Sequence, residues 1–429
     1  MAMLDSTVAN LAIGTISKQF AAPLGDVQWV ATSYLITLAL SLPLTGWLAR
    51  RVGSNRLWRA AMFAFIASST VCGLSGDLVT LIVARCSQGL AAGLMVPAGQ
   101  ALLAEVADRR QLGRLMGTVG FAVALGPALG PGLAGALLES FSWRWLFWIN
   151  IPIGMVAIIV AKFVLPPNDV VPAHRFDTTG LLLISLGLPL VLYGAATIGV
   201  ADGAVSLFML ALGVGFIFVF VKHANRSIAP LIDIRLFCAP NFSAAVATAG
   251  LTGATMYGSL LLIPLYLQDT LHLSPTNTGF MLLAMGLGSA FALPVAGHIA
   301  DRYGALKACV IGSFLLLLTV APFWFSTALT FVNVAILLFV RGGGLALAQM
   351  PAMTAAYAAV SKEEMGDAAT IINIAQRLGG ALGAITIVIV VDQVSGTGAQ
   401  GTYELGLALL GVFAIASIVT SMFLTKPPH

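Results

Sequence analysis

The amino-acid sequence predicts an all-α protein that crosses a membrane many times. Hydrophobic residues make up 59% of the 429 residues and charged residues only 9%, whereas a soluble globular protein carries roughly 25% charged residues. The apolar runs are continuous over roughly 20 residues, the length of a membrane helix, and lack the alternation of a membrane β-barrel. Lysine and arginine gather in every second break between these runs, as expected for repeated membrane crossings.

Breaks that contain charged residues, glycine or proline divide the chain into fourteen expected helices. Their expected ranges are 1–20, 28–49, 56–75, 78–105, 111–138, 145–165, 177–198, 203–223, 241–268, 276–300, 306–326, 330–360, 365–391 and 402–425. With the N-terminus in the cytoplasm, the inside loops and the C-terminal tail hold sixteen of the 21 Lys and Arg residues. The outside loops hold only Lys18 and Arg144. Because basic loops stay in the cytoplasm, we expect a multi-pass protein of the plasma (inner) membrane with both termini cytoplasmic.

A repeated pattern divides the chain into two halves. "GWLARRVGSNR" follows the second expected helix and "GHIADRYGALK" follows the tenth, and Arg85 and Arg341 come at similar distances after them. A chance likeness of helical hairpins would explain the glycines and arginines but not their matched order. Paired six-helix halves are typical of transporters. We therefore expect an N-terminal six-helix bundle over 1–165, a linker with two extra transmembrane helices over 166–240 and a C-terminal six-helix bundle over 241–429.

The sequence contains no motif for enzymatic chemistry. It lacks the phosphate-binding loop of ATP-driven pumps and any cluster of metal ligands, and its four cysteines lack metal-site spacing. We therefore expect no enzyme activity, no catalytic residue, no metal, no cofactor and no nucleic-acid partner.

One acidic and three basic residues are expected near the middle of the membrane. Asp5 lies roughly 20 Å below the outer end of its helix, and Arg85, Arg341 and Arg377 lie at comparable depth. A charge at this depth costs at least about 2.5 kcal/mol, so it is paired, hydrated or functional. Asp5 and Arg85 can form an ion pair, and two interpretations follow. The pair binds and releases a proton, or it permanently fixes the first helix against the fourth.

The other buried basic residues have less specific interpretations. Arg341 precedes three glycines, and bonds from its guanidinium to exposed backbone carbonyls are its simpler explanation. Arg377 stands near Asn373 and either faces an aqueous cavity or is structural. A candidate substrate cavity is expected to include Gln88, Asn373, Arg377 and Arg341.

Proline and glycine interrupt the fifth expected helix in the stretch "LGPALGPGLAG". Its candidate gating residues are Gly126, Pro127, Gly130, Pro131 and Gly135. Proline removes a backbone donor and glycine lets a neighbouring helix approach closely. The stretch is either a structural kink or a bend at a helix that lines the transport path.

These motifs together resemble the fourteen-helix drug:proton antiporter branch of the major facilitator superfamily, the EmrB/QacA type. "LDSTVANLAI" is similar to its first-helix motif, "RCSQGLAAG" to its fourth-helix motif and "GPALGPGLAG" to its antiporter motif, and "SWRWLFWINIPIG" is also typical of it. The resemblance implies the major facilitator fold and a proton-coupling role for Asp5 and Arg85. It also implies two conformational latch loops, whose residues are Gly46, Arg50, Arg51 and Gly53 in the first half and Gly297, Asp301, Arg302 and Gly304 in the second.

The chain departs from this family pattern in two places. Arg50 stands where the first latch loop usually has aspartate, so the first latch is expected to work differently or to be weak. Family members also carry further residues before the first-helix motif. The first helix is therefore expected to be shortened at its N-terminus.

The resemblance implies proton-coupled antiport that exports small hydrophobic drugs or toxic compounds by alternating access. One acid and three basic residues near the midplane favour neutral or weakly acidic substrates over dications. The alternatives are an exporter or proton-linked transporter of one metabolite, an inactive N-terminally truncated paralogue, and a membrane sensor without transport. The expected partners are the substrates, protons and, in a Gram-negative host, a periplasmic adaptor and an outer-membrane channel.

Overall fold

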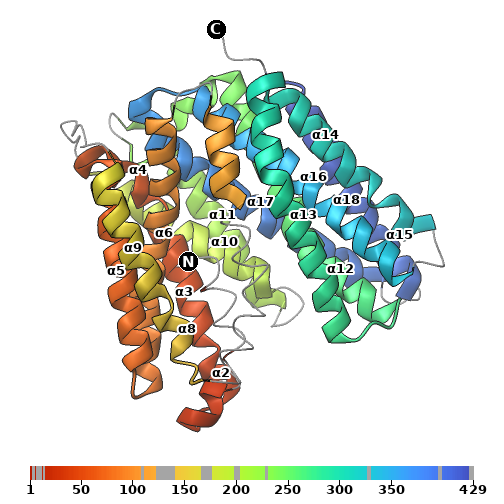
Figure 1. Cartoon of the computed structure of the whole chain (residues 1–429), viewed down its shortest axis with the longest axis horizontal. Coiled ribbons are helices and arrows are strands. Elements are labelled where there is room, and N and C mark those ends of the chain that lie inside the picture. Colours follow the sequence, from red (N-terminus) through yellow and green to blue (C-terminus); the bar gives the residue numbers. More distant parts are fainter. Residues whose placement is uncertain are drawn as a thin grey trace.

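The structure is a computed structural model, and its described part is entirely helical (Figure 1). It describes residues 1, 5, 12, 15–107, 111–121, 141–165, 176–197, 203–227, 230–325, 330–394 and 399–424. Within these ranges no β-strand occurs. The all-α fold class predicted from the composition is confirmed.

The described part of the N-terminal half contains two long helices and several shorter ones. Its described helices are α2 (Leu24–Val27), α3 (Trp29–Ser41), α4 (Leu44–Val52), α5 (Ser54–Leu74), α6 (Leu78–Val106), α8 (Trp145–Trp148) and α9 (Asn150–Val164). The helix expected over 28–49 is instead the pair α3 and α4, bent by 57°. Pro43 stands at this break, where proline lacks the N–H group that would continue the helix.

The C-terminal half follows two inserted helices. The inserted helices are α10 (Thr178–Thr197) and α11 (Gly203–Arg226). The later elements are η1 (Ile234–Cys238), α12 (Pro240–Asp269), α13 (Pro275–Tyr303), α14 (Ala305–Leu318), α15 (Ala321–Phe325), α16 (Phe331–Ala358), η2 (Lys362–Glu364), α17 (Met365–Val394) and α18 (Ala399–Ser421). Most boundaries agree with the expected ranges within a few residues, except that α14 and α15 divide the range 306–326.

Among the described residues, ten helices are long and apolar enough to cross a membrane, or eleven if α3 and α4 form one span. Much of the first and fifth expected helices lies outside the described residues. The chain is therefore a multi-span membrane protein, and the count of fourteen helices stays a prediction.

The two halves repeat the same helix packing. In the N-terminal half α6 packs against α3 and α5, and in the C-terminal half α16 packs against the corresponding helices α13 and α14. The latch loops repeat the same turn, because Gly53 and Gly304 have φ angles of 85° and 91°. Only glycine adopts this conformation readily. The repeat read from the sequence is thus also a structural repeat.

Helix α10 lies between the halves and contacts both of them (Figure 1). It packs against α3 and α17, and Ser185 Oγ donates to the backbone carbonyl of Leu40 at 3.1 Å. Helix α11 packs on the outer side of α10, and only 17% of its most apolar stretch is buried inside the protein. The inserted helices therefore fill one side of the junction.

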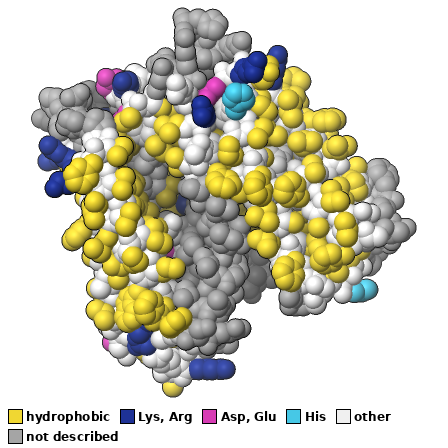
Figure 2. Space-filling model, in the orientation of Figure 1, with side chains coloured by type: hydrophobic (Ala, Val, Ile, Leu, Met, Phe, Trp, Pro, Cys, Tyr) yellow, Lys and Arg dark blue, Asp and Glu magenta, His cyan; other side chains and the backbone are white. Residues whose placement is uncertain are grey.

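The outer surface suits a lipid environment. Figure 2 shows hydrophobic side chains over the outer faces of both halves, with Lys and Arg gathered mainly near the upper edge. Phe63, Val79 and Phe163 are each about two-thirds exposed or more. Such a surface would cause aggregation in water but is favourable in a bilayer. We call the end of the molecule where α4 and α13 terminate, beside Arg50, Arg51 and Arg302, the basic end.

Candidate functional site

The ion pair predicted from the sequence forms inside the N-terminal half. Arg85 lies in the second turn of α6, and its Nη1 pairs with Asp5 Oδ2. The two side chains are 0% and 1% exposed. Each charge compensates the cost of burying the other. The structure brings the two residues together, and their role in proton transfer stays a prediction.

Three elements hold the guanidinium of Arg85 in place. Its Nε donates to the carbonyl of Val30 on α3 at 2.9 Å, and its Nη1 donates to Gln88 Oε1 at 2.7 Å. The guanidinium carbon lies 4.1 Å from the ring centre of Tyr34 and 5.7 Å from that of Phe147. These ring contacts stabilise a buried cation. The orientation of Arg85 is therefore set by α3, α6 and α8 together.

The carboxylate of Asp5 accepts hydrogen bonds from three side chains. Besides Arg85, Gln88 Nε2 and Asn150 Nδ2 donate to its Oδ1 at 3.1 and 3.0 Å. An ionised carboxylate is only an acceptor, so a site made of three donors suits the ionised form. The described surroundings of Asp5 are arranged for a negative charge.

Two members of this cluster were not predicted to contact Asp5, and the expected place of Gln88 in a substrate cavity stays a prediction. Gln88, expected in a substrate cavity, is fully buried and bonded to Asp5, Arg85 and Ser69. Asn150, in the stretch "SWRWLFWINIPIG", was not predicted as a site residue. The signal was an uncharged amide in the otherwise apolar run from Trp145 to Ala161. Nothing in the run itself indicates that this amide faces Asp5 across the bundle.

Arg341 occupies the corresponding position in the C-terminal half, and among the described residues it has no carboxylate partner. Its Nε and Nη2 donate to Ser259 Oγ on α12 at 3.0 and 2.7 Å. Its Nη1 donates to Thr319 Oγ1 and to the carbonyl of Leu316, at 3.2 and 3.3 Å. Hydroxyl groups and one carbonyl thus satisfy this buried guanidinium. It is 1% exposed, so a substrate could contact it only in another conformation.

Asn373 and Arg377 lie on α17 where the two halves meet. Asn373 Nδ2 donates to Gln100 Oε1 on α6 at 2.6 Å and to the carbonyl of Ala369 at 2.8 Å. Arg377 is partly exposed and close enough to Tyr34 for an electrostatic interaction. Contact between these two residues and a substrate stays a prediction.

The second latch loop connects the halves through Asp301. Its carboxylate accepts from the backbone N–H groups of Gly113 and Arg114 at 2.8 and 2.7 Å. These groups begin the described segment 111–121 of the N-terminal half, where backbone N–H groups favour an anion. A Cβ atom on Gly297 would lie 2.0 Å from the carbonyl oxygen of Gly113. Glycine is therefore required for this close approach.

The first latch loop uses the opposite arrangement of charge. Arg50 on α4 pairs with Asp367, which lies in the first turn of α17 and is 2% exposed. The linker joins the same contact, because Arg50 Nη2 donates to the carbonyl of Leu231 at 3.4 Å and the N–H of Asp233 donates to Asp367 at 3.3 Å. Asp367 supplies the acid from the first turn of α17 and Arg50 supplies the base from the last turn of α4, and the role of this pair as a latch stays a prediction.

The remaining basic latch residues lie against aromatic rings. Arg51 lies 5.1 Å from the ring centre of Trp47, and Arg302 lies 5.5 Å from that of Tyr303. Both latches lie at the basic end, so the halves are held together there in this conformation.

The candidate gating motif of the fifth helix, Gly126, Pro127, Gly130, Pro131 and Gly135, lies outside the described residues. In the part of the chain that is described, no group of three His, Cys, Asp or Glu residues is placed to hold a metal ion.

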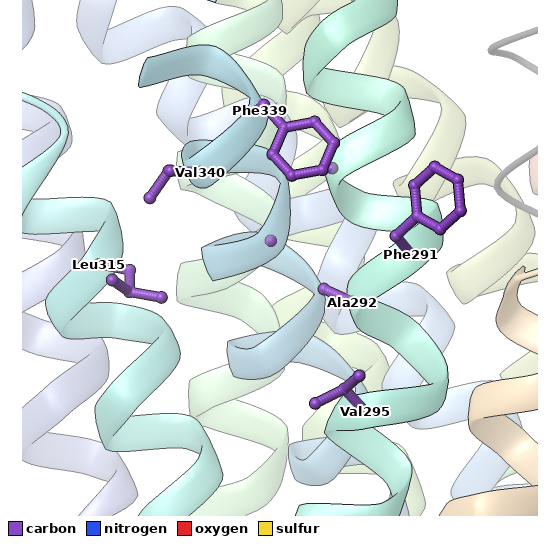
Figure 3. Close-up of a pocket in the computed structure, with 8 residues that line it drawn as sticks. Phe291, Ala292, Val295, Leu315, Phe339 and Val340 are labelled. Atoms are coloured by element: carbon purple, nitrogen blue, oxygen red, sulfur yellow. The ribbon is translucent and has the colours of Figure 1, made fainter. Parts of the chain in front are cut away.

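An apolar cavity of about 330 Å³ lies in the C-terminal half, between α13, α14 and α16 (Figure 3). Phe291, Ala292 and Val295 line it from α13, and Phe339 and Val340 line it from α16. A specific ligand site normally adds a few polar groups to orient its ligand. The lining of this cavity has no polar side chain, so it is a weaker candidate than the junction of the halves.

Sequence comparison relates the chain to membrane transporters. The family model described as Major Facilitator Superfamily matches residues 1–384. The chain is 34% identical over 391 residues to the multidrug resistance protein B homolog of Mycobacterium tuberculosis, which covers 89% of this chain and 72% of that protein.

Two solved structures share the fold at low sequence identity. The human organic anion transporter MFSD10 has a TM-score of 0.63 and 15% identity, covering 99% of this chain and 97% of that chain. The proton:xylose symporter XylE has a TM-score of 0.66 and 14% identity, covering 96% of this chain and 92% of that chain. The repeated halves, the buried ion pair and these matches agree, and the chain belongs to the Major Facilitator Superfamily of membrane transporters.

Proposed function

We propose that the protein is a proton-coupled antiporter that exports small hydrophobic compounds from the cytoplasm. The observation that carries the proposal is the enclosed pair of Asp5 and Arg85. An ionisable acid in a membrane interior is costly, and such residues therefore usually mark functional sites. The relative in Mycobacterium tuberculosis is named as a multidrug resistance protein, which supports drugs or toxic compounds as substrates.

The proposed cycle links the charge of Asp5 to the conformation of the two halves. A proton from the outside neutralises Asp5, and its attraction for Arg85 weakens. The contacts of Arg85 with α3, α6 and α8 then rearrange, and the halves rock to open the basic end. The basic end faces the cytoplasm in this proposal, following the placement of the basic residues.

Substrates are proposed to be neutral or weakly acidic. Arg377 is a partly exposed cation near the junction of the halves, and the carboxylate of Asp5 is already paired with Arg85. A dication would gain little at such a site. A periplasmic adaptor and an outer-membrane channel, as the family resemblance implies, remain proposed partners.

Transport into inside-out vesicles tests the proposal. The neutral dye Nile red, the acidic dye fluorescein and the dication methyl viologen are offered with and without a proton gradient, to wild type and to Asp5→Asn. We expect gradient-driven uptake of the first two dyes by wild type and its loss in Asp5→Asn. Gradient-driven uptake that persists in Asp5→Asn contradicts a proton role for Asp5.

A transporter of one specific metabolite has the same fold and is the second candidate function. The same vesicles distinguish the two candidates. Export of several chemically unrelated dyes supports the multidrug function, and export of none of them favours a single substrate.

A further inference from the structure

The side chains that bond Asp5 differ in how many of their own hydrogen-bonding positions are occupied. Gln88 uses both ends of its amide. Its Nε2 donates to Asp5 and to Ser69 Oγ, and its Oε1 accepts from Arg85 and from the thiol of Cys72. A primary amide has two donor hydrogens and two acceptor lone pairs, so Gln88 has no free position. Turning its amide would break all four contacts.

Asn150 has only one engaged end. Its Nδ2 donates to Asp5 Oδ1 at 3.0 Å, while its Oδ1 has no hydrogen-bond partner among the described residues. The residue begins α9 and is 1% exposed. A buried acceptor without a partner costs about 1–3 kcal/mol, and such groups are rare in folded proteins. This one lies on the side chain that contacts the candidate proton-binding carboxylate.

Protonation of Asp5 changes what its neighbours must provide. The carboxylate needs donors, but a carboxylic acid carries an O–H group that needs an acceptor. Arg85 offers only donors, and Gln88 directs its donor end at Asp5 with its acceptor end occupied. Rotation of Asn150 about its Cβ–Cγ bond exchanges its amide nitrogen and oxygen. The rotation breaks one hydrogen bond and places the unpaired oxygen against the acid.

We infer that Asn150 is a positioning residue for the proton on Asp5: its amide donates to the carboxylate and, once turned, accepts from the carboxylic acid. The proton is added to a carboxylate oxygen and later removed from it, and no other covalent bond forms or breaks. This inference rests on the proposed proton coupling at Asp5.

Other titratable groups also face Asp5 and contribute to its pH response. They are Arg85 on α6, Tyr34 on α3 and Cys72 on α5, together with the terminal amine of Met1, which interacts with Asp5 electrostatically. Asn150 differs from all of them because it has no charge in either form. Its effect on the pH profile is therefore separable from theirs by neutral substitutions.

The test compares Asn150→Leu and Asn150→Ala with Asn150→Ser, whose hydroxyl can both donate and accept. Asn333→Leu, at an exposed position in the first turn of α16, is the control for loss of an amide. Gradient-driven Nile red uptake is measured against pH. Because a hydrogen bond to a charged group is stronger than one to a neutral group, we expect Leu and Ala to move the half-maximal pH upward by roughly one unit. Asn150→Ser should move it less, and Asn333→Leu not at all.

Infrared spectroscopy of the purified protein supplies a second readout. The C=O band of the protonated acid is assigned by its loss in Asp5→Asn. We expect this band at higher wavenumber in Asn150→Leu and Asn150→Ala, because the acid has lost its acceptor, and near the wild-type position in Asn150→Ser. The Asn150→Ala variant removes the amide without adding bulk, so a result shared by both variants does not depend on how well leucine fits.

Two results are distinguishable. If Asp5→Asn keeps gradient-driven transport and shows the same carboxyl band, the proposed function itself fails. If Asp5→Asn abolishes both, but Asn150→Leu and Asn150→Ala leave the pH profile and the band unchanged, proton coupling at Asp5 stands and the inference about Asn150 is overturned.

Discussion

Arg85 and Arg341 are two buried arginines at corresponding positions whose partners differ in one decisive respect. Arg85 has a carboxylate, Asp5, and Arg341 has a hydroxyl group, that of Ser259. Both side chains are almost fully buried. A hydroxyl group does not change its charge with pH, whereas a carboxyl group does. Of these two arginine sites, only the one in the N-terminal half contains a partner that can take up a proton, so the proposed proton coupling is assigned to that half.

The substitution Arg85→Met should destabilise the protein, because it leaves Asp5 buried without its partner. The expected loss is about 3–5 kcal/mol of unfolding free energy. Adding Asp5→Asn to the same chain removes the unpaired charge and should restore a large part of the stability but not the proton coupling. Thermal unfolding in detergent measures the stability of both chains. If the double variant is no more stable than Arg85→Met alone, the two residues are not coupled as the structure indicates.

Arg341→Met is the matched experiment in the other half. It should also lower the unfolding temperature, since Ser259 and Thr319 lose a buried donor. The pH at which vesicle transport is half-maximal should stay at the wild-type value. A shift of that pH comparable to the one expected for Asn150→Leu would show that the C-terminal half also affects proton exchange.

At the level of helices, both latches join the halves through a carboxylate, but its partners differ. Asp301, in the last turn of α13, places its carboxylate against the backbone N–H groups at the start of 111–121. In the other latch the acid, Asp367, belongs to the first turn of α17, and Arg50 comes from the last turn of α4. Both arrangements place a negative charge at a helix N-terminus. The unusual arginine at position 50 thus preserves the electrostatic pattern of the latch.

Gly297→Ala should weaken the second latch, because its Cβ would overlap the carbonyl oxygen of Gly113. Overpacking of this kind costs typically about 1–3 kcal/mol. A lower population of the state closed at the basic end should reduce vesicle transport at least about fivefold. Gly279→Ala is the control, because a Cβ atom there has no neighbour within 4 Å. Equal transport rates for the two variants would contradict the close contact between Gly297 and Gly113.

For the whole molecule, the described contacts between the halves include both latches at the basic end and the link from Asn373 to Gln100. Helix α10 adds contacts with α3 and α17 along one side. Transport by alternating access requires the contacts at the basic end to separate and form again in each cycle. The proposed function therefore predicts that both latches open and close during transport.

A disulfide across the first latch tests this requirement. A Cβ atom on Gly366 would lie 3.2 Å from the Cβ atom of Ala49, close to the spacing that a disulfide needs. With the four native cysteines replaced, Ala49→Cys combined with Gly366→Cys should cross-link under oxidation and lose almost all transport. Reductant should restore transport, and either single variant should be insensitive to oxidation. Undiminished transport by the cross-linked protein would show that the basic end does not open.

The sequence predicted the large features because they follow from composition and pattern. The long apolar runs, the repeated loops and the possible pairing of Asp5 with Arg85 could all be read from the sequence. The bend at Pro43, the pairing of Arg50 with Asp367 and the contact of Asn150 with Asp5 could not. Each of these depends on which faces of distant helices meet, and residues 145 positions apart leave no periodic signal.

The most direct test of proton coupling counts the protons that the purified protein releases when it binds Nile red in weakly buffered solution. If substrate and proton compete through Asp5, wild type should release about one proton per bound dye molecule near the midpoint pH. Asp5→Asn should bind the dye and release none. Proton release by Asp5→Asn equal to that of wild type would show that another group carries the proton.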